Sequence, residues 1–463
     1  MTTVIEPAVE QRVTGRKGRW IDHWEPEDPE FWRRTGRRVA NRNLAFSILA
    51  ENIGFSVWVL MSIVVVNLGA VGFDFGVSQT FWLLIVPNLV GAALRLPYTF
   101  AIPRFGGRAF TTVSACLLMI PCLMLAYAVT NPATPYWFFL LTAAAMGFGG
   151  GNFSSSMANI SFFFPERKKG IALGLNAAAG NLGVAVTQLV VPLVITMGTG
   201  INLAYAALMW MPLIVLAAAC AWLFMDSISS ARPDGVSYRN AMKNKHTWVV
   251  SILYIGTFGS FIGFSFAFPT LIGLAFDEFT SFVGLAFLGA LIGAVTRPLG
   301  GWLADRTSGA AVTVAVFAGL GAGSLSVLLS VAVDSFALFF GSFIVLFVLT
   351  GLGNGSTYRM IPLIFSAQTR ARAAGTGENL DVALRAAKRQ GGAVVGVAGA
   401  VGAFGGVLVN LSFSYSLDKA GTLTPALLVL VGFYTVCLAT TWWFYLRTRV
   451  AAGRYPSLAY ARV

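Results

Sequence analysis

Long apolar runs are the feature that most restricts how this chain can fold. Only 11% of its 463 residues are charged and 56% are hydrophobic, whereas soluble domains carry about 25% charged residues. Twelve runs are long enough to cross a bilayer as α-helices, which takes about 20 residues each. The sequence therefore predicts an all-α integral membrane protein with twelve transmembrane helices. They cover approximately residues 44–68, 79–103, 109–130, 136–164, 170–197, 202–225, 248–273, 280–303, 310–332, 336–362, 391–416 and 423–446.

Basic side chains are concentrated in segments that alternate along the chain. The net charge is +13, and Lys and Arg gather at both ends and in the connections at 104–108, 167–169, 232–245 and 370–389. Cytoplasmic loops of membrane proteins carry such an excess of Lys and Arg. An even number of helices with basic segments at both ends predicts two cytoplasmic termini, and a lipid bilayer rather than nucleic acid as partner. We expect no removable signal peptide, because the N-terminus lacks a short apolar run before a small-residue cleavage site.

Cysteine and histidine are too few and too scattered to predict a metal site. The four cysteines all fall inside apolar runs and have no metal-ligand spacing. The two histidines, His23 and His246, flank the predicted helices. No nucleophile–base pair lies within the apolar runs either. We therefore expect no metal, no cofactor and no enzymatic activity.

The chain consists of two halves that resemble one another. The longest polar connection in its first two-thirds, residues 226–246, follows the sixth predicted helix. Three short motifs recur in the same order in both halves. They are Ile53-Gly-Phe-Ser56 with Ile262-Gly-Phe-Ser265, Gly91-Ala-Ala-Leu-Arg95 with Gly293-Ala-Val-Thr-Arg297, and Gly147-Phe-Gly-Gly-Gly151 with Gly351-Leu-Gly-Asn-Gly355. Two parallel halves with a substrate site between them at mid-bilayer are typical of transporters of the major facilitator superfamily.

This repeat also predicts the domain organisation. Each half is expected to form a pseudo-symmetric six-helix bundle, and the polar connection between the halves is expected in the cytoplasm. The predicted parts are a cytoplasmic N-terminal segment at 1–43, an N-terminal bundle at 44–226, a cytoplasmic linker at 227–247, a C-terminal bundle at 248–447 and a cytoplasmic tail at 448–463.

Two arginines lie inside otherwise uncharged apolar runs. Arg95 and Arg297 occupy the same place in the G-A-x-x-R motif of the two halves. An arginine at the centre of a membrane helix costs at least about 2.5 kcal/mol and by default indicates a functional site. The alternatives are a fixed carboxylate partner or snorkelling to an interface, but Glu51 is the only Asp or Glu well inside a predicted helix. Because a planar, bidentate donor suits an oxyanion, the pair predicts an anion site between the halves.

Glu51 has two interpretations. It lies in the first predicted helix, two residues before the repeated Ile53-Gly-Phe-Ser56. It is either a structural counter-ion of one arginine or the carrier of a coupling proton. The residues themselves do not decide between these roles.

The fifth and eleventh predicted helices are rich in glycine. Small residues let membrane helices pack closely, and a smooth surface also lets helices slide. Asn181, and after it Asn176, are polar side chains that can donate to an anion. Phe153, Tyr254 and Phe258 can wall a flat anion, although packing is the simpler interpretation in a chain with 37 phenylalanines. The glycines predicted to act in packing and gating are Gly170, Gly174, Gly180, Gly183, Gly399, Gly402, Gly405 and Gly406.

Nearly the whole chain resembles the bacterial NarK-type nitrate/nitrite porter family of the major facilitator superfamily. The resemblance is carried by Trp24-Glu-Pro-Glu-Asp-Pro-Glu-Phe-Trp32, by Gly151-Asn-Phe-Ser-Ser-Ser-Met-Ala-Asn-Ile-Ser-Phe-Phe-Phe-Pro165 and by Gly170–Gly183. It departs from the family at Ala177–Ala179, where members often carry more glycine. Glu51 also differs from the apolar residue expected in the exchangers, so the coupling mode is in question. The residues that the resemblance implies around a planar monoanion are Arg95, Arg297, Phe153, Phe258, Tyr254 and Asn181.

These observations predict a nitrate/nitrite transporter in the bacterial inner membrane, working as a monomer by rocker-switch alternating access. An anion would screen the two arginines from each other and let the halves close, whereas the empty carrier resists closure because like charges repel. That rule favours nitrate/nitrite antiport. Two alternatives stay open: proton-coupled nitrate symport through Glu51, and exchange of another small oxyanion such as phosphate.

Overall fold

The computed structural model describes residues 19–231, 235–447, 457–461 and 463. The remaining parts of the predicted N-terminal segment, linker and tail lie outside the described residues. Apart from two strands of two residues each, the regular elements that are described are helices. The prediction of an all-α chain is therefore confirmed.

The first half of the chain contains the helices that carry Glu51, Arg95, Phe153 and Asn181. A short strand and two short helical segments precede them. The elements are β1 (Trp20–Ile21), α1 (Pro29–Phe31), η1 (Trp32–Gly36), α2 (Arg37–Val59), α3 (Met61–Asn67), η2 (Gly69–Val71), α4 (Val77–Phe105), α5 (Gly107–Leu117), α6 (Met119–Thr130), α7 (Tyr136–Phe163), α8 (Glu166–Ile195), α9 (Ala204–Leu208), α10 (Trp210–Phe224) and β2 (Ser227–Ile228).

The second half contains the helices that carry Tyr254, Phe258 and Arg297. One of its segments, η3, is a single π-helical turn, a feature found frequently at functional sites. The elements are α11 (Gly235–Lys243), α12 (Lys245–Tyr254), η3 (Ile255–Gly259), α13 (Ser260–Ala275), η4 (Asp277–Ala286), α14 (Phe287–Arg306), α15 (Gly309–Ala332), α16 (Phe336–Thr376), α17 (Leu380–Ala420), α18 (Thr424–Thr441), η5 (Trp442–Leu446) and η6 (Ala459–Ala461).

Each of the twelve predicted segments is helical. Eleven helices of the described chain are long and apolar enough to cross a membrane. α7 is long enough at 28 residues, but its glycine, serine and asparagine residues lower its hydropathy below that of the other eleven. Two predicted ends are wrong: α16 and α17 are 41 residues each and extend well past residues 362 and 391. The added turns are rich in Ala and Arg, which both favour helix, but their charged side chains interrupt the apolar run.

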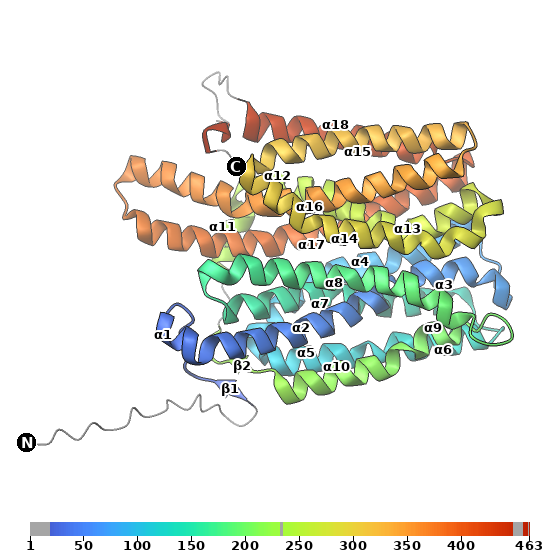
Figure 1. Cartoon of the computed structure of the whole chain (residues 1–463), viewed down its shortest axis with the longest axis horizontal. Helices are drawn as coiled ribbons and strands as arrows, with labels where there is room; N and C mark the ends of the chain where they lie inside the picture. Colours follow the sequence, from blue (N-terminus) through green and yellow to red (C-terminus); the bar gives the residue numbers. More distant parts are fainter. Residues whose placement is uncertain (1–18, 232–234, 448–456, 462) are drawn as a thin grey trace, which may run out of the picture.

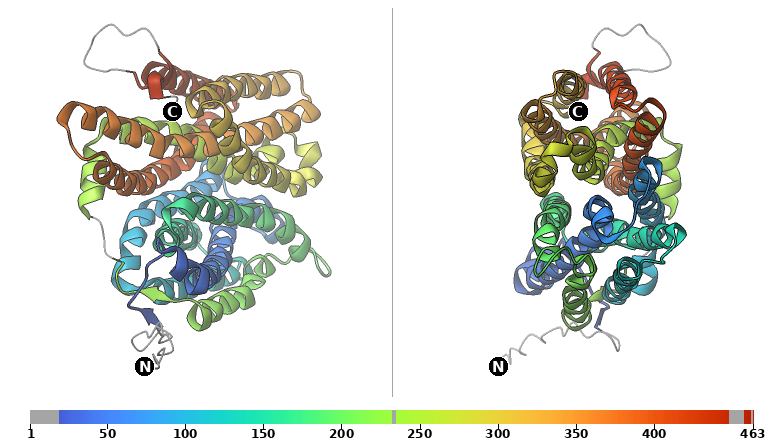
Figure 2. Two further views of the ribbon diagram at one scale, coloured as in Figure 1. Left: turned by 60° about the vertical axis from the view of Figure 1, so that its left-hand side comes forward. Right: turned by 90° about the vertical axis from the view of Figure 1, so that its right-hand side faces the viewer.

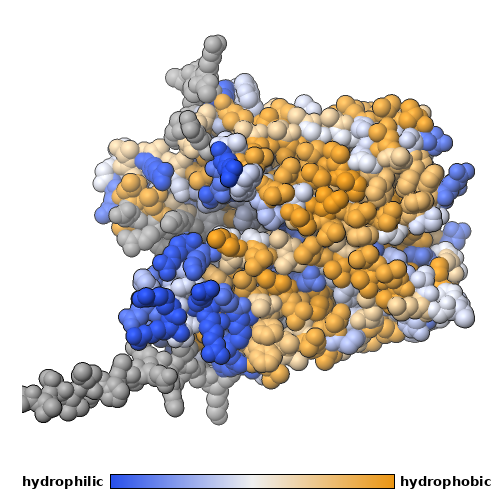
Figure 3. All heavy atoms as spheres, in the orientation of Figure 1, coloured by the Kyte–Doolittle hydropathy of each residue, from blue (hydrophilic) through white to orange (hydrophobic). Residues whose placement is uncertain are grey.

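The two halves form two layers of helices that lie side by side (Figures 1 and 2). Across the boundary between the layers, α4 packs against α17, α8 against α14, and α3 against α13. Apolar residues cover the middle of the outer surface, and hydrophilic residues gather at its ends, most densely near the N-terminal segment (Figure 3). This banded surface is that of a multi-pass membrane protein, with the predicted site at the boundary between the two layers.

The N-terminal segment is held against one end of the first half. β1 pairs in parallel with β2, which follows α10 directly. Trp24 donates from Nε1 to the Phe162 carbonyl, 3.1 Å away, and packs edge-on against Phe163. Asp28 caps α1 by accepting from the Glu30 amide. These contacts give a physical role to the W-x-P-E-D-P-x-F-W stretch, for which the sequence offered none.

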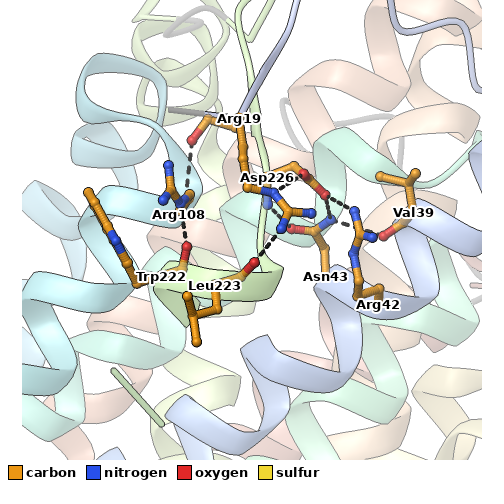
Figure 4. Close-up of polar contacts among 9 residues, drawn as sticks. Arg19, Val39, Arg42, Asn43, Arg108, Trp222, Leu223 and Asp226 are labelled. Carbon is orange, nitrogen blue, oxygen red and sulfur yellow. Dashed lines mark hydrogen bonds and ion pairs between the residues drawn. The ribbon is translucent and has the colours of Figure 1, made fainter. Parts of the chain in front are cut away.

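A cluster around Asp226 completes this attachment (Figure 4). Asp226 is 5% exposed. It accepts from Arg19 Nε at 3.0 Å and from Arg42 Nη2 at 2.5 Å, and Asn43 Nδ2 donates to it at 3.0 Å. Close by, Arg108 donates from Nε to the Trp222 carbonyl at 2.6 Å. The carboxylate therefore ties the N-terminal segment to α2 and to the end of α10.

Candidate functional site

The two predicted arginines lie at the boundary between the halves. Arg95 of α4 has no exposed surface, and Arg297 of α14 is 6% exposed. They are close enough for each positive charge to be felt by the other. Neither forms an ion pair with a carboxylate anywhere in the described part of the chain. Two buried cations therefore face the same region without a fixed counter-ion.

Arg95 is surrounded by aromatic rings and one backbone carbonyl. Its Nη1 donates to the carbonyl oxygen of Gly399 on α17 at 2.8 Å, so this bond joins the two halves. The guanidinium carbon lies 4.7 Å from the ring centre of Phe153 and 4.9 Å from that of Phe258. Trp58 of α2 lies at 5.8 Å. Ring faces attract a cation without neutralising it, so Arg95 keeps its full charge.

Arg297 has a similar environment in the second half. Its Nη2 donates to the Tyr254 hydroxyl at 3.1 Å, and its guanidinium carbon lies 5.5 Å from the ring centre of Tyr358 on α16. Tyr254 stacks on Phe258 at 5.2 Å, and Phe258 on Phe153 at 6.2 Å. The stack therefore extends from one arginine to the other. The π-helical turn η3 includes Phe258 and begins directly after Tyr254.

Several buried polar atoms in this region have no hydrogen-bond partner among the described residues. They are Arg95 Nε and Nη2, Arg297 Nη1 and the Tyr358 hydroxyl. Both amide atoms of the buried Asn181 on α8 are unpaired as well, but none of the described contacts joins Asn181 to either arginine. Leaving a buried donor unpaired costs about 1–3 kcal/mol, and more if it is charged. Such a concentration of unpaired donors around two cations is what a site for a small, oxygen-bearing anion requires.

Glu51 of α2 is fully buried beside this region but is not a close counter-ion. Its Oε2 accepts from Asn176 Nδ2 at 2.6 Å, whereas its Oε1 has no partner among the described residues. A side chain at Gly180 would collide with the carboxylate. The charges of Arg95 and Arg297 act on Glu51, but no ion pair within 4 Å joins it to them in the described chain.

The predicted glycines fall into two groups. A Cβ at Gly402 or Gly405 would collide with the Tyr254 ring or with Gly259, and one at Gly183 with the Asn52 carbonyl. Close packing therefore accounts for this group, which also includes Gly180 and Gly406. Gly170 and Gly174 have no atom within 4 Å of the Cβ position, and Gly399 has only an ordinary contact. Packing does not explain this second group, and its role in gating stays a prediction.

Sequence reasoning missed three groups at this site. Trp58 and Tyr358 contact the guanidinium groups, and the Gly399 carbonyl accepts from Arg95. Tyr358 had a usable signal: the matched glycine motifs align Phe153 with Thr357, the residue directly before it. Trp58 had none, because one indole among many aromatic residues is not distinctive.

Comparison with known proteins gives three consistent results. A family model described as Major Facilitator Superfamily matches residues 52–380. The nitrate/nitrite transporter NarU of Escherichia coli strain K12 is 40% identical over 444 residues, covering 92% of this chain and 96% of NarU. The protein named "Probable nitrate/nitrite antiporter NarK2" of Thermus thermophilus is 35% identical over 459 residues, covering 93% of this chain and 97% of that protein.

A solved structure supports the same fold. The crystal structure of a D-xylose–proton symporter superposes with a TM-score of 0.62, covering 86% of this chain and 96% of the symporter. The two sequences are 13% identical, so this likeness concerns the fold alone. It agrees with the arrangement of the helices in two layers.

Proposed function

The chain belongs to the Major Facilitator Superfamily and to the family of the NarU transporters, and we propose that it carries nitrate and nitrite across a bacterial inner membrane. The observation that carries this proposal is the pair of buried arginines, which have no carboxylate partner in the described part of the chain. One chain supplies both arginines, so a monomer suffices. Alternating access is the mode of transport of this superfamily.

The topology that we propose has twelve spans and two cytoplasmic termini. α7 is the twelfth span, because it lies within the first half between α4 and α8 and makes extensive contacts with α2 and α4. The basic residues near the N-terminal segment and in the α4–α5 connection support a cytoplasmic location for that end of the molecule.

In the proposed site a planar anion lies between the two guanidinium groups. Arg95 Nε and Nη2 and Arg297 Nη1, which are unpaired, donate to its oxygens. Phe153 and Phe258 flank its flat faces, while Tyr254 orients Arg297 and Asn181 adds a neutral donor. Nitrate and nitrite carry one negative charge and are flat, so they match both the fork of the donors and the parallel rings.

Exchange of nitrate for nitrite follows from the charges. With an anion bound, the repulsion between Arg95 and Arg297 is screened and the halves can close around it. Without an anion, two like charges in a region of low dielectric oppose closure, so the empty carrier returns slowly. A transported anion on the opposite side is then required for each cycle, which is antiport.

Proton-coupled nitrate uptake is the second candidate, and Glu51 favours it. The carboxyl group is fully buried, and one of its oxygens has no partner in the described chain. Because its negative charge acts on both arginines, protonation would change the charge of the empty site. That change would allow the halves to rearrange without a return anion.

Proteoliposomes separate the two modes. Uptake of isotope-labelled nitrate is measured once with internal nitrite and once with no internal anion but an inward proton gradient. Strict dependence on internal nitrite supports antiport and excludes symport. Gradient-driven uptake that disappears in Glu51→Gln supports symport instead. Phosphate that competes as well as nitrite would contradict the proposed substrate.

A further inference from the structure

A stripe of buried polar side chains runs along α7 away from the anion site. Asn152, Ser155, Ser156 and Asn159 are each at most 6% exposed. Their spacing of i, i+3, i+4 and i+7 places them on one face of the helix. Polar groups inside a membrane helix are expensive and mark pathways by default. Neither the arginine pair nor the aromatic stack uses this face.

Two neighbouring helices present polar side chains to the same stripe. Ser47 and Glu51 of α2 are one turn apart, and so are Thr111 and Ser114 of α5. With Ala50 and the α7 residues Asn152, Ser155 and Ser156 they line a cavity of about 10 Å³. A polar cavity of about this size holds one water molecule if it offers two to four hydrogen-bonding partners. We call these polar residues, together with Asn159, the polar seam.

Hydrogen bonds and unpaired atoms alternate along the polar seam. Ser47 Oγ and Ser156 Oγ are 2.9 Å apart, and Asn176 Nδ2 donates to Ser156 Oγ at 2.7 Å and to Glu51 Oε2 at 2.6 Å. Glu51 Oε1, both amide atoms of Asn152 and Asn159 Nδ2 have no partner in the described chain. Since buried polar groups are nearly always satisfied, these atoms indicate places for bridging water.

The polar seam leads from Glu51 to the end of the first half that carries the α4–α5 connection. Asn159 lies directly against Gly107, the first residue of α5, where a Cβ would come within 1.9 Å of the amide oxygen. Arg108 follows, within the cluster around Asp226 (Figure 4). This end is the cytoplasmic one in the proposed topology. Glu51 is therefore placed between the anion site on one side and the polar seam on the other.

The groups that face Glu51 differ on its two sides. Arg95 of α4, Arg297 of α14 and Tyr358 of α16 act on it electrostatically from the anion site. From α7 and α8 it meets the neutral groups Ser156 and Asn176. A proton that left through the anion site would pass two cations, which repel it. The polar seam offers neutral acceptors only.

We propose that the polar seam conducts protons between Glu51 and the cytoplasmic end, separately from the path of the anion. The proposal rests on the proton-coupled mode of the proposed function. In the release step the O–H bond of the neutral Glu51 carboxyl breaks and its proton passes to a seam water, leaving a carboxylate and a hydronium ion. That excess proton moves on through water and the serine and threonine hydroxyls.

The double variant Thr111→Val/Ser114→Val tests this route, because it removes two hydroxyls and fills the cavity without touching Glu51 or the arginines. Thr112→Val is the matched control. Its hydroxyl bonds to a carbonyl of its own helix, as that of Ser114 does, but Thr112 is not among the residues that line the cavity. Proteoliposomes containing a pH-sensitive dye report the protons that enter with nitrate. Exchange of labelled for unlabelled nitrate, with no pH gradient, reports the anion site alone.

We expect the double variant to slow proton entry at least about tenfold, the effect of removing partners from buried polar groups, with nitrate exchange and the control unchanged. Proton entry at the wild-type rate would overturn the proposed route. If the double variant also loses nitrate exchange, the rate at which the Glu51 carboxyl exchanges its proton for deuterium is measured by infrared spectroscopy instead of transport. A slower exchange than in the wild type supports the route, and an equal rate refutes it. If the wild-type protein exchanges nitrate but lets no protons enter, the proton coupling is refuted. If the wild-type protein does not exchange nitrate at all, the proposed function is refuted.

Discussion

Two groups of arginines in this molecule differ in whether a carboxylate neutralises them. Arg19 and Arg42 share the carboxylate of Asp226 at one end of the first half, and about a third of each arginine side chain is exposed. Arg95 and Arg297 are almost completely buried, yet within the described chain their direct contacts are aromatic faces, a hydroxyl and a backbone carbonyl, with no carboxylate. The arginines that water can reach are neutralised, and those that it cannot reach are not.

Desolvation explains why this difference indicates function. A buried charge without compensation costs several kcal/mol in a folded protein, so a structural arginine acquires a carboxylate, as at Asp226. A site that must bind and release an anion cannot keep such a carboxylate, because it would compete with the substrate. The groups in direct contact with Arg95 and Arg297 are neutral, and Glu51 acts on them only from beyond ion-pair distance, so the close compensation is left to a ligand.

The largest expected effect is that of Arg95→Lys. The ammonium group keeps the charge but cannot donate two parallel bonds, and hydrogen bonds to charged groups contribute about 1.5–3 kcal/mol. Since about 1.4 kcal/mol is a factor of ten, nitrate uptake in proteoliposomes should fall about ten- to hundredfold. Arg42→Lys is the control and should transport nearly normally. If Arg95→Lys binds nitrate as tightly as the wild type, the buried arginines do not differ from Arg19 and Arg42 in function.

Asp226→Asn should lower the stability of the protein and leave transport unchanged, in contrast to Arg95→Lys. It leaves Arg19 and Arg42 without their common counter-ion. The free energy of unfolding should fall by about 1–2 kcal/mol, a value between those for exposed and for buried ion pairs. Thermal unfolding in detergent should therefore shift to lower temperature, while the affinity for nitrate stays the same. A lowered affinity with unchanged stability would mean that the cluster belongs to the transport site.

Some features of the fold and of the candidate site could be predicted from the sequence, and others could not. The helices followed from apolar run length, and Arg95 and Arg297 from the cost of burying a guanidinium. The ends of α16 and α17 could not be predicted in this way, because helical turns that extend beyond the bilayer are polar and leave no apolar run in the sequence. Tyr358 was missed for another reason. The repeated glycine motifs point to its neighbour Thr357 and not to Tyr358 itself, and packing fixes which of the two faces the site.

Tyr358→Phe tests that missed residue. Its ring lies beside Arg297 and its buried hydroxyl has no partner among the described residues, so we expect the hydroxyl to donate to the bound anion. Losing one neutral hydrogen bond costs about 1 kcal/mol, so the KM for nitrate should rise about fivefold. Tyr136→Phe is the control, since that hydroxyl bonds to the Gln79 carbonyl at an exposed end. An unchanged KM in Tyr358→Phe would mean that Arg297 uses only the ring face.

The smallest effect is expected for Gly399→Ala. Arg95 is held by the backbone carbonyl of this residue, which the substitution keeps, and the new methyl group makes only an ordinary contact with Phe153. Alanine favours a helix interior by about 0.5–1 kcal/mol over glycine, so a slightly raised unfolding temperature and normal nitrate uptake are expected. A clear loss of uptake would show that Gly399 is needed for movement of α17. The contrast with Asp226→Asn is physical: a carboxylate partner can be removed by one substitution, whereas a carbonyl partner stays and can be displaced only by a competing acceptor such as the anion.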